Sequence, residues 1–157
     1  MSAATLRRPL IAGNWKLNKT AAEAADFIKQ LRALLPADPH PEVVVAPAYP
    51  ALESAVRAAA GSPVMIAAQN VFWEPSGAYT GEVSVEMIKS LGADLVIIGH
   101  SERRQYFGET NESVNQRIKA TLAGGLRPIV CVGETLEERE AGQTFKVVET
   151  QVSGGLA

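Results

Sequence analysis

The chain has 157 residues, of which 46% are hydrophobic and 20% are charged, and its formal net charge is -2. This length and hydrophobic content predict a folded domain with its own core and exclude a disordered chain. The small, evenly mixed charge offers no electrostatic surface for nucleic acid or an anionic membrane. The longest apolar runs are too short to cross a bilayer. We therefore expect neither nucleic acid nor a membrane as a partner.

The cellular compartment is suggested by the cysteine count and by the start of the chain. A single cysteine, Cys131, rules out an internal disulfide framework. The segment Met1–Arg8 lacks the apolar core of a secretory signal peptide. Together these features predict a reducing, cytoplasmic setting.

Five short apolar runs alternate with longer segments of helical periodicity. The runs are Pro9–Trp15, Val43–Ala46, Val64–Ala68, Asp94–Gly99 and Pro128–Val132. Runs rich in Val and Ile without polar alternation are typical of parallel strands buried on both faces. Five consecutive β–α units predict an α/β protein with a parallel sheet, as one domain over residues 1–157. The periodicity alone does not separate a closed barrel from an open, doubly wound sheet.

Several helix boundaries are marked by capping residues and glycines. Thr20-Ala-Ala-Glu23 has the spacing of a capping box, which predicts the start of the first helix. Three later helices are expected to stop at Gly61, Gly92 and Gly124. Thr144 is predicted to cap the last helix, whose inward face would carry Phe145, Val148 and Val152.

Polar residues at the end of the first strand are the first candidates for a site, because ligands of parallel α/β folds bind where strands end. Lys16 follows an apolar strand directly and could provide a fixed positive charge for a phosphate or a developing oxyanion. Asn14 lies two residues earlier, on the same face, and offers a neutral hydrogen-bond donor. A solvated lysine beside a turn asparagine is the plain alternative.

A second polar cluster, His100-Ser101-Glu102, follows the fourth strand. A helix N-terminus disfavours positive charge, so His100 should be neutral and able to donate a hydrogen bond to a substrate carbonyl. Glu102 would need a cationic partner if it were buried, and Lys16 is the obvious candidate. The alternatives are a structural histidine and a surface ion pair between Glu102 and Arg103.

The segment 72–84 is unusually aromatic for a solvated loop, since it contains Phe72, Trp73 and Tyr79. Exposed aromatic side chains in a protruding loop suggest a surface for a protein partner. A loop folded back on its own domain is the alternative.

These segments resemble triose-phosphate isomerases in order and spacing over nearly the whole chain. The strings that carry the resemblance are Gly13–Asn18, Val45–Pro47, Ala68–Val71, Gly77–Ser84, Ile98–Arg104 and Val130–Glu134. The resemblance implies a (β/α)8 TIM barrel that interconverts dihydroxyacetone phosphate and glyceraldehyde 3-phosphate through an enediolate, in glycolysis and gluconeogenesis, without a metal or cofactor. The resemblance also implies an imidazole kept neutral by a helix N-terminus, in agreement with the expectation for His100.

The resemblance also implies roles for individual residues. Asn14 and Lys16 would contact the substrate, with Lys16 offsetting phosphate and enediolate charge. His100 would move a proton between the two substrate oxygens, and Glu102 would place Lys16. Ser101 would lie near the catalytic base, and Cys131 would support packing.

The loop 72–84 would form a homodimer by entering the neighbouring subunit. Thr80, Tyr79 and Glu82 are the residues expected in that interface, with Thr80 near the partner's site.

A complete barrel of this kind has eight strands and about 250 residues. By resemblance, the catalytic glutamate follows the sixth strand, a mobile lid comes next, and phosphate loops follow the last two strands. Glu134 matches a different family position and is not expected to be the base. We therefore expect an incomplete barrel of about five βα units, inactive alone, whose open sheet edges drive self-association.

The sequence is consistent with two functions. The chain could be an isomerase whose remaining strands are elsewhere, or a non-catalytic (βα)5 folding or assembly fragment that keeps half a phosphate site. An unrelated anion-binding α/β domain is disfavoured by the density of motifs at both strand ends.

Overall fold

A computed structural model describes residues 8–38 and 41–157. The described chain forms two compact units, one of residues up to Gln69 together with Leu91–Asp94, the other of Asn70–Ser90 and Leu95–Ala157. The segment 1–7, on which the expectation about a signal peptide mostly depends, lies outside the described residues. A single domain over residues 1–157 stays a prediction.

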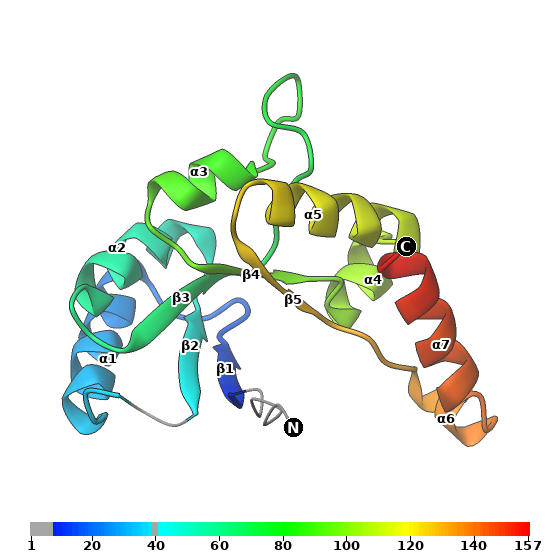
Figure 1. Ribbon diagram of the computed structural model, residues 1–157, viewed down its shortest axis with the longest axis horizontal. Coiled ribbons are helices and arrows are strands. Elements are labelled where there is room, and N and C mark those ends of the chain that lie inside the picture. Colours follow the sequence, from blue (N-terminus) through cyan, green and yellow to red (C-terminus); the bar gives the residue numbers. More distant parts are fainter. Residues whose placement is uncertain (1–7, 39–40) are drawn as a thin grey trace, which may run out of the picture. The chain divides into compact units, whose positions relative to one another are not determined.

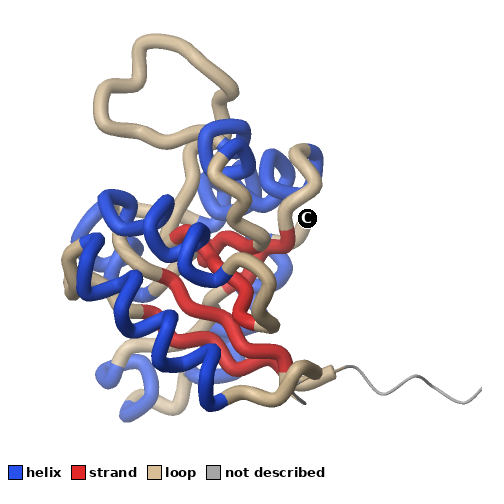
Figure 2. The backbone as a smooth tube through the Cα atoms, turned by 90° about the vertical axis from the view of Figure 1, so that its left-hand side faces the viewer, coloured by secondary structure: helices blue, strands red, loops and turns tan. Residues whose placement is uncertain are grey.

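The first unit is a three-stranded parallel sheet covered by two helices. Its elements are β1 (Leu10–Asn14), α1 (Ala21–Leu34), β2 (Glu42–Ala46), α2 (Tyr49–Ala59) and β3 (Val64–Ala68). β1 pairs in parallel with β2, and β2 with β3. The two helices pack on each other and lie on one side of the three strands (Figure 1, Figure 2). The core of this unit is built from nearly inaccessible side chains such as Ile28, Leu52 and Ile66.

The capping box that the sequence predicts at the start of α1 is confirmed. The Thr20 hydroxyl accepts from the Glu23 backbone N–H, and a Glu23 carboxylate oxygen accepts from the Thr20 N–H at 2.8 Å. The hydrogen bond from the Thr20 backbone, followed by the one from its hydroxyl, lowers the pKa of Glu23. Two orphan N–H groups of the helix are thereby satisfied, which fixes where the helix begins.

The second unit contains the remaining seven elements. They are α3 (Val85–Ser90), β4 (Leu95–Ile98), α4 (Ser101–Phe107), α5 (Asn111–Ala123), β5 (Arg127–Val130), α6 (Leu136–Glu140) and α7 (Thr144–Gly155). β4 and β5 pair in parallel, and α5 packs on both strands and on α7. The four residues of β4 are all buried, as expected for a strand covered on both faces.

The predicted five β–α units with parallel strand pairing are confirmed. Each predicted strand is present within one or two residues of its predicted limits, and β3 coincides with them. Within the described ranges, no helix is both long and apolar enough to span a membrane.

The prediction for the inward face of α7 is wrong for Phe145 and Val152, whereas Val148 is half-buried. Phe145 and Val152 are 89% and 39% exposed, and Gln143 rather than Thr144 precedes the first turn, without a side-chain capping bond. The face that packs on α5 instead includes Gly154 and Gly155, where the helices approach closely. A Cβ added at Gly154 would lie 3.0 Å from the Cβ of Asn111. Close approach at small residues, rather than the position of the largest apolar side chains, decides which face of α7 turns inward.

Gly124 ends α5 as predicted, but for a different reason from a left-handed terminator. Its φ is -76°, which any residue adopts. A Cβ at this position would lie 2.3 Å from Cγ1 of Val85. The glycine is needed because α3 begins against the end of α5, whereas Gly61 and Gly92 do have positive φ.

Candidate active-site half-sites

The first group of candidate site residues, called here the first half-site, is Asn14 and Lys16 in the turn that follows β1. Lys16 has a φ of 52°, in the left-handed region that residues with a Cβ seldom occupy. Its N–H donates to Oδ1 of Asn14 at 3.0 Å. Because Oδ1 of Asn14 is the acceptor, its Nδ2 is the atom that can donate to a ligand. The structure therefore brings Asn14 and Lys16 together as the sequence predicts.

A glutamine that sequence analysis did not single out fastens this turn. Nε2 of Gln69, directly after β3, donates to the carbonyl oxygens of Lys16 at 3.0 Å and of Ala46 at 2.8 Å. The Ala46 oxygen also accepts from the Trp15 N–H at 3.0 Å. The turn after β1 is thus tied to the ends of β2 and β3.

The far end of the same turn is held by a cation–π cluster. Lys19, with φ of 70°, places its ammonium 5.5 Å from the ring centre of Trp15 and 5.1 Å from that of Phe27. The two rings meet edge to face at 5.2 Å. These contacts join the turn to α1 and restrict its movement.

The second half-site is the start of α4, where His100 is the N-cap. Nδ1 of His100 accepts a hydrogen bond from the Glu102 backbone N–H at 3.3 Å. Because Nδ1 is the acceptor in this arrangement, Nε2 is the ring nitrogen that can donate to a ligand. The histidine side chain is 21% exposed, which leaves it partly accessible. The geometry leaves Nε2 of His100 as a hydrogen-bond donor, and the neutrality of the ring stays a prediction.

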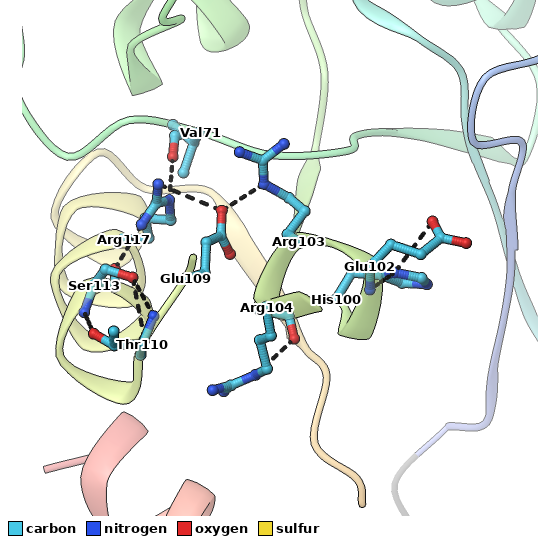
Figure 3. A network of polar contacts seen from close by, with 10 residues as sticks. Val71, His100, Glu102, Arg103, Arg104, Glu109, Thr110, Ser113 and Arg117 are labelled. Atoms are coloured by element: carbon cyan, nitrogen blue, oxygen red, sulfur yellow. Dashed lines mark hydrogen bonds and ion pairs between the residues drawn. The ribbon is translucent and has the colours of Figure 1, made fainter. Parts of the chain in front are cut away.

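The Glu102 carboxylate lies beside the same ring (Figure 3). Its Oε2 is 3.5 Å from Nδ1 of His100, a contact that would be an ion pair only if Nδ1 were protonated. A backbone N–H can only donate, so Nδ1 of His100 is the acceptor in its contact with the Glu102 N–H. Glu102 is 41% exposed, and the neighbouring Ser101 is exposed in the first turn of α4.

A buried ionic network, which sequence analysis missed, lies between α4 and α5. Glu109 is 2% exposed and its Oε1 accepts from Nε of Arg103. The same oxygen lies 3.4 Å from Nη2 of Arg117, which is 6% exposed (Figure 3). A glutamate between a helix-ending glycine and a helix-starting threonine is typical of a surface loop, so no local signal identifies it.

This network also reaches the base of the loop 72–84. Nε of Arg117 donates to the carbonyl oxygen of Val71 at 2.9 Å, and its guanidinium lies 4.8 Å from the ring centre of Trp73. The Phe72 N–H donates to the Val83 oxygen at 2.8 Å and closes the loop at its base. One buried cation therefore joins α5 to the start of the loop.

The loop itself projects from the second unit (Figure 1). The Phe72 ring packs on Trp73 at 4.1 Å and on Tyr79 at 4.6 Å between centres. Tyr79 is 45% exposed, and Thr80 and Glu82 are exposed as well. The loop is internally ordered by its aromatic side chains while its outer residues face solvent.

Two residues near the end of β5 have environments that suit structural roles. Burial raises the pKa of the Cys131 thiol, and the charge of Arg104 opposes that shift only in part. Hydrogen bonding from its own backbone N–H, together with Arg139 and Thr144, lowers the pKa of Glu134. A protonated thiol and an ion-paired carboxylate are a poor nucleophile and a poor base, respectively.

Comparison with known proteins identifies relatives along nearly all of this sequence. A family model described as "Triosephosphate isomerase" matches residues 9–157. A triosephosphate isomerase of Citrifermentans bemidjiense is 58% identical over 151 residues, which cover 96% of this chain and 60% of that relative. One of Moorella thermoacetica is 55% identical, with the same shares covered, and one of Endomicrobium trichonymphae is 52% identical, covering 97% and 61%. This chain thus spans about 60% of the length of the relatives it matches.

Proposed function

Because this chain belongs to the triosephosphate isomerase family, we propose that its two half-sites serve one isomerase site. The reaction is the interconversion of dihydroxyacetone phosphate and glyceraldehyde 3-phosphate through an enediolate. The five β–α units correspond to five of the eight in the family's (β/α)8 barrel. The observation that carries the proposal is the placement of His100 at the start of α4, where its Nδ1 accepts from the Glu102 N–H and leaves Nε2 as the donor.

Each half-site has a distinct part in the proposed reaction. Nε2–H of His100 donates to the substrate carbonyl and polarises it, which makes the proton on the adjacent carbon easier to remove. The Lys16 ammonium offsets the charge of the phosphate and of the developing enediolate, and Asn14 donates to the substrate. Glu102 places Lys16. These roles require Lys16 and His100 to reach the same substrate.

Proton abstraction also needs a base, which typically contributes a factor of about 10² to 10⁴ in rate. None of the four half-site residues acts as this base; they are Asn14, Lys16, His100 and Glu102. Glu134 is held in an ion pair with Arg139 at 2.5 Å. By the family resemblance, the base is a glutamate after a sixth strand. The 157-residue chain alone should therefore be inactive.

We propose two kinds of association for the protein. The first is a homodimer formed through the loop 72–84, supported by the exposure of Tyr79, Thr80 and Glu82. The second is self-association of the 157-residue chain through β1, where Leu10 and Ile11 are 37% and 61% exposed. We further propose that the protein acts in the cytoplasm, in glycolysis and gluconeogenesis.

An enzyme-coupled isomerisation assay tests this function. The match covers 60% of the Citrifermentans bemidjiense isomerase. The chain would be measured alone and after mixing with the remaining part of that relative, which by the family resemblance is its C-terminal part. We expect no turnover from either piece alone and measurable turnover from the mixture. Turnover by the 157-residue chain alone would contradict the assignment of the base, and an inactive mixture of associated pieces would contradict the assignment of the half-sites.

A further inference from the structure

The left-handed conformation of Lys16 must be held by its surroundings. A residue with a Cβ gains nothing from this region on its own and occupies it when neighbouring contacts over-determine the backbone. Lys16 is exposed, so core packing of its side chain does not provide that restraint. Hydrogen bonds to both of its peptide groups provide such a restraint.

Gln69 makes the bond on the carbonyl side. Its Nε2 has two hydrogens, and the distances of 3.0 Å to the Lys16 oxygen and 2.8 Å to the Ala46 oxygen give each hydrogen an acceptor. Both acceptors are carbonyls, so the orientation of the side-chain amide is determined, with nitrogen toward the turn. Ala46 ends β2 and Gln69 follows β3. The Lys16 carbonyl is therefore held in place relative to both strands.

Asn14 makes the bond on the amide side, with its Oδ1 3.0 Å from the Lys16 nitrogen. With both flanking peptide groups held, the direction of the Cα–Cβ bond of Lys16 is set before any ligand binds. The long side chain then starts from a fixed point, which limits the positions available to its ammonium.

We propose that Gln69 is a positioning residue for Lys16, acting through the Lys16 backbone without touching the substrate. The functional part of this inference rests on the proposed isomerase site, whereas the restraint on the backbone does not. Gln69 therefore affects substrate binding indirectly, because its side chain contacts the Lys16 backbone and not the substrate.

The substitution Gln69→Glu tests this role, because it keeps the size of the side chain and removes both N–H donors. A carboxylate facing two carbonyl oxygens should release the turn. We expect hydrogen exchange at the Lys16 amide, followed by NMR in the 157-residue chain, to accelerate at least several-fold. In the reconstituted mixture, we also expect the dissociation constant for dihydroxyacetone phosphate to rise about tenfold, because the ammonium would no longer start from a fixed point.

Two features separate positioning from loss of packing. Lowering the pH should partly restore both readouts relative to the unsubstituted chain, since a protonated carboxyl regains one O–H donor. The matched control is Gln151→Glu, because Gln151 also bonds to backbone, through the Gly133 N–H at 2.8 Å and oxygen at 2.9 Å, in the other unit. This control should leave Lys16 exchange and ligand affinity unchanged.

Unchanged Lys16 exchange in a folded Gln69→Glu chain would overturn the proposal, as would faster exchange with unaltered affinity. Should Gln69→Glu fail to fold, Gln69→Met removes the donors without adding charge and is judged by the same two readouts. No binding by the unsubstituted reconstituted mixture would count against the proposed function, and Lys16 exchange would then decide the role of Gln69.

Discussion

Replacing His100 with glutamine should lower turnover of the reconstituted isomerase by a factor of about 10² to 10⁴, the usual contribution of a positioned acid–base group. Glutamine can donate a hydrogen bond, but its amide cannot take up and return a proton as an imidazole can. His100→Asn should be impaired to a similar degree, although asparagine is a good N-cap and keeps an acceptor for the Glu102 N–H. Both variants would be measured in the coupled assay under saturating substrate.

The control for this experiment is Gln105→Ala, an exposed position on the same helix. Its turnover should equal that of the unsubstituted protein. If His100→Asn kept full turnover while His100→Gln lost it, the cap of α4 rather than the imidazole would be responsible. Full turnover in both variants would remove His100 from the reaction.

Replacing Glu109 with alanine should lower the free energy of unfolding by about 3–5 kcal/mol, the range found when one partner of a buried ion pair is removed. Arg117 is 6% exposed and would be left without the carboxylate 3.4 Å from its Nη2. The base of the loop 72–84 should also loosen, because Arg117 holds the Val71 carbonyl. Urea denaturation measures the first effect and hydrogen exchange over residues 70–84 the second.

Glu53→Ala is the matched control, since it removes the same side chain from an exposed pair. Glu53 and Arg57 lie 2.5 Å apart with side chains 55% and 79% exposed. Pairs of this kind contribute about 0–1 kcal/mol because water screens them and their side chains lose entropy. Equal destabilisation by the two substitutions would show that the Glu109 network adds nothing beyond a surface ion pair.

The parts of the fold that sequence reasoning predicted are those with a local signal. The capping box at Thr20 and Glu23 involves neighbouring residues and fixes the start of α1 without reference to the rest of the chain. The buried strands are recognised from continuous runs of branched apolar side chains, such as Val96-Ile97-Ile98. These features are predicted correctly because tertiary packing agrees with the local preference of the chain.

The errors and omissions come from contacts between distant segments. Phe145 was expected inside because it is apolar, but α7 approaches α5 at Gly154 and Gly155 and leaves Phe145 exposed. Gln69 lies 53 residues from Lys16, and Glu109 acquires its role only when α4 and α5 enclose it. A polar side chain that bonds to remote backbone carries no pattern in sequence that separates it from a solvated one.

The two half-sites differ in how well the sequence predicts their geometry. The hydrogen bond that the His100 ring accepts follows from its place directly before a helix, where a backbone N–H is available to it. The left-handed backbone of Lys16 could not be foreseen, because the residue type disfavours that conformation. Its restraint by Asn14 and Gln69 is visible only in the folded turn.

A titration with dihydroxyacetone phosphate, observed by NMR, tests most directly whether the two half-sites serve one ligand. The reconstituted mixture would carry isotope labels on the Lys16 side chain and the His100 ring, so that both are followed in a single sample. We predict that the two signals change together, with one dissociation constant, and that Lys16→Ala weakens the response of His100. Changes at one residue only, or two unrelated dissociation constants, would contradict a common site.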